Sequence, residues 1–300
     1  MQNPFLDRSK ARPIVVGHRG VPAVHQENTL AGFRRAVSLG IPAVELDVRL
    51  TRDGHAVVCH DDDLRRLTGE AGRISKLTWD QVSHRRIRKQ LPMGIDHTGT
   101  QVVIDYGVEE RIPLLSEVFS EFGEALLFNV ELKLDTPSWS TKVATATARE
   151  LEKYQLETRS VVTSFDLRKL SATRKHRPAQ PIGFCYDDGM LSIFGPMQGV
   201  LGPTRSNRLL RRALRSHWSR FIATTEVVGV EHTLVTETNV AAMRERGLAV
   251  GSYTLFPVGS TTGKPISAAA SDPREVDRLV ALGLDWIETD DPERLQSLLG

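Results

Sequence analysis

Short apolar runs alternate with amphipathic stretches along almost the whole chain. The apolar runs have the length and composition of buried strands, which we expect at 14–17, 43–48, 126–132, 160–163, 181–184, 220–224, 249–253 and 285–288. Between them apolar residues recur at helical spacing, and we expect helices at 29–39, 115–122, 139–154, 167–176, 206–217, 238–246, 273–282 and 292–299. Several of these segments begin near Thr, Ser or Pro, and Gly follows them, as in capped helices.

This order of elements predicts the fold class. A strand followed by a helix, repeated about eight times without a block of consecutive strands, is typical of a parallel (β/α)8 TIM barrel in the α/β class. An open doubly wound sheet is the alternative, although no G-x-G-x-x-G motif follows the first strand. Residues 61–113 interrupt the alternation and predict a small insertion after the second strand. We therefore expect one domain over residues 1–300.

Composition and charge restrict the partners. The chain has 39 Lys and Arg against 37 Asp and Glu, a net charge of +2, which argues against nucleic acid as a partner. Arginines at helical spacing within 205–220 predict a solvated helix face, with a membrane-surface or acidic-partner contact as the alternative. No apolar run reaches membrane-spanning length, so we expect no stable membrane insertion. Cys59 and Cys185 form no C-x-x-C motif, which argues against a thiolate zinc site and fits a cytoplasmic location.

Titratable residues cluster at the ends of the apolar runs. His18 and Arg19 directly follow the first run and combine a proton carrier with an anion-binding guanidinium. Glu45 and Asp47 lie two residues apart, and in a strand this spacing directs both carboxylates to one face. Two such carboxylates repel each other unless a positive group lies between them. A divalent cation such as Mg²⁺ or Ca²⁺ is one solution, and pairing with Arg or Lys of neighbouring strands is the other.

The next strand repeats this arrangement with Glu131 and Lys133. In a barrel Glu131 would join Glu45 and Asp47 at the same rim, where three carboxylates make a plausible oxygen site for a metal. Lys133 would then face a bound anion, whereas a structural Glu–Lys pair is the alternative interpretation. These side chains therefore predict either a metal centre or a network of ion pairs.

A second histidine, His60, comes after a predicted hairpin turn at Asp53-Gly54 and a short returning strand. Asp61 is a candidate to orient its imidazole, although adjacent side chains often point apart. Two histidines beside a carboxylate cluster can act as general base and general acid. Together with Arg19 and Lys133 they supply the groups that metal-assisted phosphoryl transfer requires. Glycoside cleavage would leave the histidines and the arginine without a role.

These motifs resemble those of the glycerophosphodiester phosphodiesterase family, and the resemblance covers most of the chain. It is carried by Gly17-His18-Arg19-Gly20, Glu27-Asn28-Thr29, Glu45-Leu46-Asp47-Val48, Thr51-x-Asp53-Gly54, Val58-x-His60-Asp61, Glu131-Leu132-Lys133 and the closing segment from Gly283 to Pro292. The resemblance implies a (β/α)8 barrel that hydrolyses glycerophosphodiesters, small-molecule substrates, to glycerol 3-phosphate and an alcohol. It also implies that 61–113 is the insertion which members of this family carry.

The resemblance further implies a role for each site residue. Glu45, Asp47 and Glu131 would bind a divalent cation (Mg²⁺ or Ca²⁺, or else Mn²⁺), His18 and His60 would form the acid–base pair, and Arg19 and Lys133 would bind the phosphate. The favoured route is attack by the glycerol hydroxyl of the substrate through a cyclic phosphate, with direct attack by water as the alternative. The family commonly has Trp-Thr on its seventh strand, where this chain has Tyr253-Thr254 and then a Gly/Ser/Thr-rich loop at 258–270. Tyr253 and Phe165 are candidates to line the pocket.

Three rival functions remain at this point. A lysophospholipase D or sphingomyelinase D-like enzyme would apply the same chemistry to lipid phosphodiesters. A metal-dependent aldolase or lyase on a similar barrel would leave His60 and Lys133 without evident roles. A barrel that has lost catalysis and serves for binding conflicts with the intact set of histidines and carboxylates.

Overall fold

Eight parallel strands close into a barrel in the computed structural model, which describes residues 2–133, 140–187, 224–261 and 265–300. The strands are β1 (Ile14–Gly17), β2 (Ala43–Leu50), β6 (Leu127–Leu132), β7 (Ser160–Ser164), β8 (Ile182–Tyr186), β9 (Val227–Glu231), β10 (Ala249–Leu255) and β11 (Trp286–Thr289). Strand β1 pairs with both β2 and β11, which closes the barrel. The predicted TIM barrel is therefore confirmed, and the open sheet is excluded.

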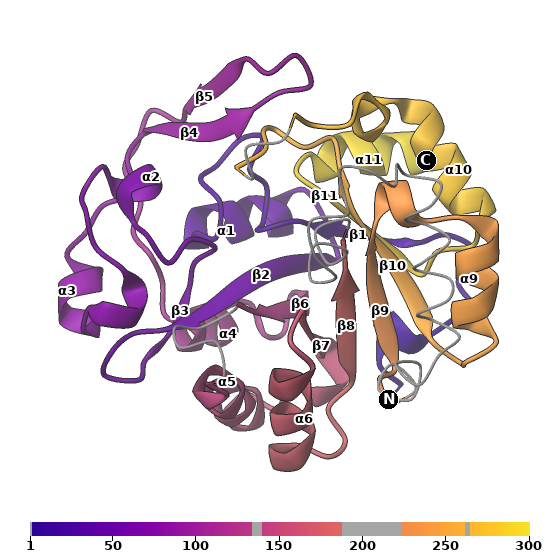
Figure 1. Cartoon of the computed structure of the whole chain (residues 1–300), viewed down its shortest axis with the longest axis horizontal. Coiled ribbons are helices and arrows are strands. Elements are labelled where there is room, and N and C mark those ends of the chain that lie inside the picture. The colour runs from indigo at the N-terminus through magenta and orange to yellow at the C-terminus, as the bar shows by residue number, and fades with distance from the viewer. Residues whose placement is uncertain (1, 134–139, 188–223, 262–264) are drawn as a thin grey trace, which may run out of the picture.

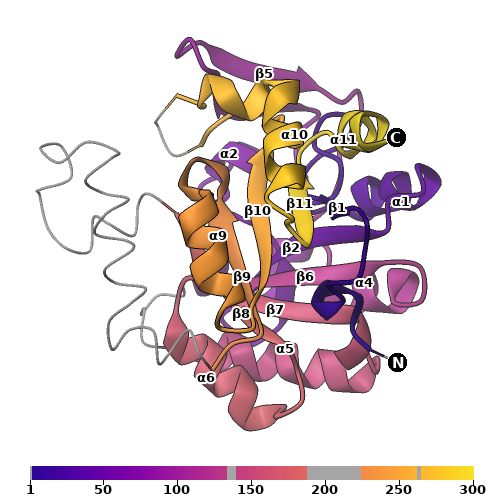
Figure 2. The same ribbon diagram turned by 90° about the vertical axis from the view of Figure 1, so that its right-hand side faces the viewer.

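Helices surround the barrel on the outside, as Figures 1 and 2 show. They are α1 (Leu30–Ser38), α4 (Leu115–Phe122), α5 (Lys142–Lys153), α6 (Leu167–His176), α9 (Glu237–Arg244), α10 (Pro273–Ala281) and α11 (Pro292–Leu299). Their starts follow capping rules, because Thr29, Asp272 and Asp291 each accept a backbone N–H of the first turn. None of the helices in the described ranges combines the length and hydrophobicity that crossing a bilayer requires.

The sixth strand lies later in the chain than predicted. The expected strand at 220–224 falls outside the described residues except for Thr224, which lies in a turn. The sixth barrel strand is instead β9, in which Val227, Val228 and Val230 are buried and pair with β8 and β10. The register with β8 and β10 identifies this later apolar run as the sixth strand. The expected helix at 206–217 and the first residue of the one at 139–154 also lie outside the described residues.

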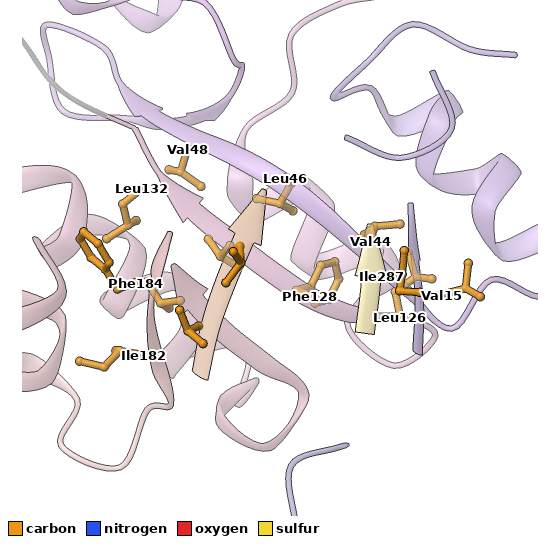
Figure 3. Close-up of a cluster of buried hydrophobic side chains, with 14 of the residues drawn as sticks. Val15, Val44, Leu46, Val48, Leu126, Phe128, Leu132, Ile182, Phe184 and Ile287 are labelled. Carbon is orange, nitrogen blue, oxygen red and sulfur yellow. The ribbon is translucent and has the colours of Figure 1, made fainter. Parts of the chain in front are cut away.

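Side chains alternate between the helices and the interior of the barrel. On β2, Val44, Leu46 and Val48 belong to the main hydrophobic core, and Figure 3 shows them along the neighbouring strand β6, which carries Phe128 and Leu132. Phe128 packs edge-on against Phe119 of α4, which fixes this face of the strands as the outer one. The period of two then directs the intervening residues of β2 and β6 into the barrel.

The segment after β2 forms a separate group of short elements beside the barrel. Strand β2 first turns at Gly54 (φ +89°) into the antiparallel strand β3 (Ala56–Val58), as expected for an Asp-Gly turn. The elements that follow are α2 (Arg65–Thr68), α3 (Trp79–Ser83), β4 (Gln90–Ile95) and β5 (Gln101–Asp105), which lie along the left and upper left of Figure 1. They pack around a second hydrophobic cluster that includes Leu64, Leu67 and Leu91.

This group also contacts the loop after β10. The backbones of Ile95 and Ser260 exchange two hydrogen bonds of 3.0 and 2.9 Å. Gly94 permits the close approach, since a Cβ there would lie 1.9 Å from the carbonyl oxygen of Ser260. The described part of the loop expected at 258–270 is thus held against this group of short elements.

Candidate active site

Three carboxylates meet inside the barrel, on two neighbouring strands. Glu45 and Asp47 project inward from β2, and the parallel register sets Asp47 directly beside Glu131 of β6. One oxygen atom of each of these side chains lies within 4.8 Å of the others. Glu45 and Asp47 are buried, whereas Glu131 is half-buried. The structure therefore brings together the three residues that the sequence singled out as metal ligands.

The electrostatics of this cluster favour a cation. Burial raises the pKa of Glu45 well above its usual range, and the neighbouring carboxylates of Asp47, Glu288 and Glu131 act in the same direction. Its Oε1 atom is buried and has no hydrogen-bond partner among the described residues. Carboxylate oxygens are the ligands that Mg²⁺ and Ca²⁺ prefer, so these residues fit a hard divalent cation.

Two basic side chains already partly neutralise the cluster. Lys133 Nζ lies 2.9 Å from Asp47 Oδ1 and 2.8 Å from Glu131 Oε1, and Arg19 Nε lies 3.3 Å from Asp47 Oδ2. Although burial opposes ionisation, Lys133 and Arg19 hold the pKa of Asp47 well below its usual range. The ion pairs that were the alternative to a metal are therefore present, but they involve the carboxylates of Asp47 and Glu131. Glu45 accepts the backbone N–H of Arg19 at 3.0 Å.

Each of the two histidines has a carboxylate on its Nδ1 atom. His18, directly after β1, lies 2.6 Å from Asp290 Oδ1, and His60, shortly after β3, lies 2.7 Å from Asp61 Oδ1. A carboxylate on Nδ1 fixes the tautomer and leaves Nε2 for proton transfer. The Nε2 atom of His18 lies 3.9 Å from Glu45 Oε2. Asp61 therefore orients the imidazole of its sequence neighbour His60, a contact that the sequence alone did not decide.

His60 is held in its neutral form. Burial lowers the pKa of His60 to about 4, and the positive charges of Arg19 and Lys133 act in the same direction. The carboxylates of Asp47 and Asp61 oppose this shift without reversing it. At neutral pH His60 can therefore accept a proton.

A cavity of about 400 Å³ opens beside these residues. Its lining includes His18, Arg19 and Asp290, together with Tyr253 and residues of the loop after β10. Phe165 is not among the described lining residues and packs edge-on against Tyr253, with the ring centroids 6.4 Å apart. The cavity therefore gives a small ligand access to His18 and Arg19 at the carboxyl ends of the strands, where TIM barrels carry their active sites.

Comparison with known proteins identifies the family. The model of the glycerophosphoryl diester phosphodiesterase family matches residues 18–294. The chain belongs to this family. Because the family consists of phosphodiesterases, the protein is an enzyme, and its TIM barrel carries a phosphodiesterase site.

Relatives of this phosphodiesterase are similar over their whole length or over part of it. A glycerophosphodiester phosphodiesterase of Caldanaerobacter subterraneus is 28% identical over 292 residues, covering 96% of this chain and 98% of the relative. A lysophospholipase D of Rattus norvegicus is 33% identical over 129 residues, covering 43% of this chain and 39% of the relative.

Solved structures share the fold of this phosphodiesterase. A glycerophosphoryl diester phosphodiesterase structure from Silicibacter pomeroyi superimposes with a TM-score of 0.69 at 22% identity, covering 99% and 97% of the two chains. A phosphodiesterase of Oleispira antarctica, in complex with sn-glycerol 3-phosphate, has a TM-score of 0.67 at 23% identity, covering 96% and 97%.

Several residues of the candidate site were not among the predicted ones. Asp290, the partner of His18, follows β11, so the rule that selected His18 would also have selected it. Glu27 and Asn28 belong to the motif Glu27-Asn28-Thr29, for which the sequence indicated no role. In the structure Asn28 donates a hydrogen bond of 2.7 Å to Asp47 Oδ2. Glu288 accepts from Asn129 and Trp286 inside the barrel. Arg66 lies in the insertion, and no sequence pattern pointed to it.

Proposed function

We propose that this enzyme hydrolyses glycerophosphodiesters to glycerol 3-phosphate and an alcohol, using a divalent cation and the histidine pair His18 and His60. One observation carries the proposal: the oxygen atoms of Glu45, Asp47 and Glu131 gather within 4.8 Å of one another, and His18 Nε2 lies 3.9 Å from Glu45. The sn-glycerol 3-phosphate bound to the Oleispira antarctica neighbour supports the choice of product.

The charges of the site suit a phosphodiester. Glu45, Asp47 and Glu131 would hold the cation, which when bound supplies Lewis-acid stabilisation of the phosphate oxygens. Lys133 and the part of the Arg19 guanidinium outside its ion pairs add positive charge for the phosphate. Tyr253 and the loop after β10 would surround the remainder of the substrate.

The two histidines divide the proton transfers. His60, neutral at physiological pH, accepts the proton of the attacking hydroxyl at Nε2, and His18 donates a proton to the departing alkoxide. We favour the substrate's own glycerol hydroxyl as the nucleophile. A cyclic phosphate then forms, and the histidines exchange roles when water opens it. Direct attack by water needs the same two proton transfers in a single displacement.

A panel of phosphodiesters tests this function. Purified enzyme is incubated with glycerophosphocholine, glycerophosphoethanolamine, lysophosphatidylcholine and a diester without a glycerol hydroxyl, each with Mg²⁺, Ca²⁺ or Mn²⁺. We expect glycerol 3-phosphate from the first two substrates and no turnover of the diester that lacks the hydroxyl. Cleavage of that diester would support direct attack by water. Preference for the lysophospholipid would favour lipid substrates, consistent with the Rattus norvegicus relative. If none of the four diesters were cleaved, the proposal would be contradicted.

The low pKa of His60 predicts the acid side of the pH profile. An ordinary imidazole, with a pKa of about 6.5, would be about nine-tenths protonated at pH 5.5. His60, with a pKa of about 4, remains neutral there, so kcat/KM should persist at pH 5.5 and fall as the pH drops through about 4. Measurement of kcat/KM from pH 3.5 to 9 checks this expectation. An acid midpoint at pH 6.5 or above would contradict it.

A further inference from the structure

We propose that Arg66, an arginine of the insertion, is a positioning residue that holds the His60 side and the Arg19 side of the site in register. The inference rests on the proposed function, and it goes beyond it by giving the insertion a part in the reaction. Arg66 lies on α2, outside the barrel strands, and its side chain is 15% exposed. Its guanidinium contacts two carboxylates, each of which contacts a different functional side chain.

The first connection leads to the imidazole of His60. Arg66 Nε donates to Asp61 Oδ2 at 2.6 Å, and the other oxygen of Asp61 lies 2.7 Å from His60 Nδ1. Asp61 is next to His60 in sequence, where neighbouring side chains often diverge. The hydrogen bond from Arg66 fixes the carboxylate in the orientation that His60 needs.

The second connection leads to the guanidinium of Arg19. Arg66 Nη1 and Nη2 donate to the two oxygens of Glu27 at 2.8 and 2.7 Å. Glu27 Oε1 also accepts from Arg19 Nη1 at 3.1 Å, and the Glu27 side chain is 2% exposed. Although burial opposes it, Arg66 and Arg19 lower the pKa of Glu27 to about 2, so it stays ionised. A buried carboxylate thus joins two arginines, one in the insertion and one beside the cavity.

The shape of the guanidinium explains why this position needs arginine. Its planar fork offers N–H donors in fixed directions, so one side chain can grip Glu27 with two nitrogens and Asp61 with the third. A lysine ammonium is a single point of charge and cannot span both carboxylates in the same way. Arg88 holds α2 in place by donating to the backbone carbonyls of Arg65 and Arg66, without a described contact to the site.

Kinetics separate positioning from mere structural support. We expect Arg66→Met to lower kcat about 10- to 100-fold, the range typical for loss of a supporting contact, and also to raise KM. The fall in kcat is expected because Asp61 is no longer held in the orientation that His60 needs. The rise in KM is expected because Glu27 is no longer held against Arg19. Asp61→Asn should therefore reproduce mainly the fall in kcat, and Glu27→Gln mainly the rise in KM. Arg66→Lys should restore less than a tenth of the lost kcat.

Two arginines of the same region serve as controls. Arg65→Met alters an exposed neighbour on α2 that pairs with Asp63, and Arg88→Met removes an anchor of the same helix. Neither control substitution should change KM. A separate test combines Arg66→Met with Asp61→Asn, and in that background Arg66→Met should lose most of its effect on kcat. Equal loss in Arg88→Met and Arg66→Met, or fully additive effects of Arg66→Met and Asp61→Asn, would overturn the inference.

A second measurement does not depend on activity. The ring nitrogens of His60 in isotope-labelled protein report by NMR the tautomer and the hydrogen bond on Nδ1. Arg66→Met should shift these resonances, and Arg65→Met should leave them unchanged. If the wild type cleaves no diester, the proposed function fails while this test still decides the positioning role. Unchanged His60 resonances together with unchanged kinetics in Arg66→Met would refute that role.

Discussion

Replacing His18 or His60 by Ala is expected to lower kcat about 10²- to 10⁴-fold on a glycerophosphodiester, the contribution typical of a positioned acid or base. Each imidazole is fixed by a carboxylate on Nδ1. In the proposed mechanism each replacement therefore removes either the acceptor for the proton of the attacking hydroxyl or the donor to the departing alkoxide. The fold should survive, since both residues lie past strand ends and outside the hydrophobic core. Steady-state rates, with circular dichroism and thermal unfolding of each variant, test the prediction.

The chain offers matched controls for these two substitutions. His55→Ala and His84→Ala change imidazoles whose side chains are 50% and 77% exposed, and neither should alter kcat. A substrate with a 4-nitrophenyl leaving group adds a second test, because that group departs without protonation. The variant that lacks the acid should recover much of its rate on this substrate, and the variant that lacks the base should not. Wild-type turnover in either His variant would refute the acid–base assignment.

The local part of the site could be predicted from the sequence because it depends on strand periodicity. The spacing of Glu45 and Asp47 already places them on one face, and Glu131 follows from the same rule applied to the next parallel strand. The register of β2 and β6 then brings Asp47 beside Glu131. Alternation of strand and helix similarly predicted the barrel, because about eight repeats of a strand followed by a helix are typical of this fold.

The remaining contacts depend on chain closure and could not be read from local patterns. His18 and Asp290 are 272 positions apart and meet only because β1 pairs with β11. Arg66 reaches Glu27 across 39 positions from α2, a helix of four residues that is too short for a sequence pattern to define its orientation. The sixth strand was misplaced for a related reason. Pairing with β8 and β10 identifies Val227–Glu231 as the sixth strand, and this pairing cannot be read from the local sequence.

Removing divalent cations is expected to abolish activity, and adding Mg²⁺, Ca²⁺ or Mn²⁺ should restore it. A Lewis-acid contribution of several kcal/mol corresponds to at least about 10³-fold in rate, since about 1.4 kcal/mol is tenfold. Asp47→Asn and Glu131→Gln should each cause a comparable loss that added metal does not restore. Rates measured after chelation and after titration with each cation check this. Full activity in excess chelator would contradict the metal requirement.

The buried position of Glu45 extends this prediction to stability. Without a cation, Asp47 and Glu131 repel its carboxylate, and its Oε1 finds no hydrogen-bond partner in the part of the chain that the structure describes. A ligand that binds only the folded state stabilises it, so saturating metal should raise the melting temperature of the wild type. Glu45→Gln relieves the repulsion and removes a ligand, so in chelator it should melt at or above the wild-type temperature and respond little to metal. Glu288→Gln alters an equally buried carboxylate that accepts from Asn129 and Trp286, and it should keep the response. An equal metal-induced shift in Glu45→Gln and wild type would mean that the cation binds elsewhere.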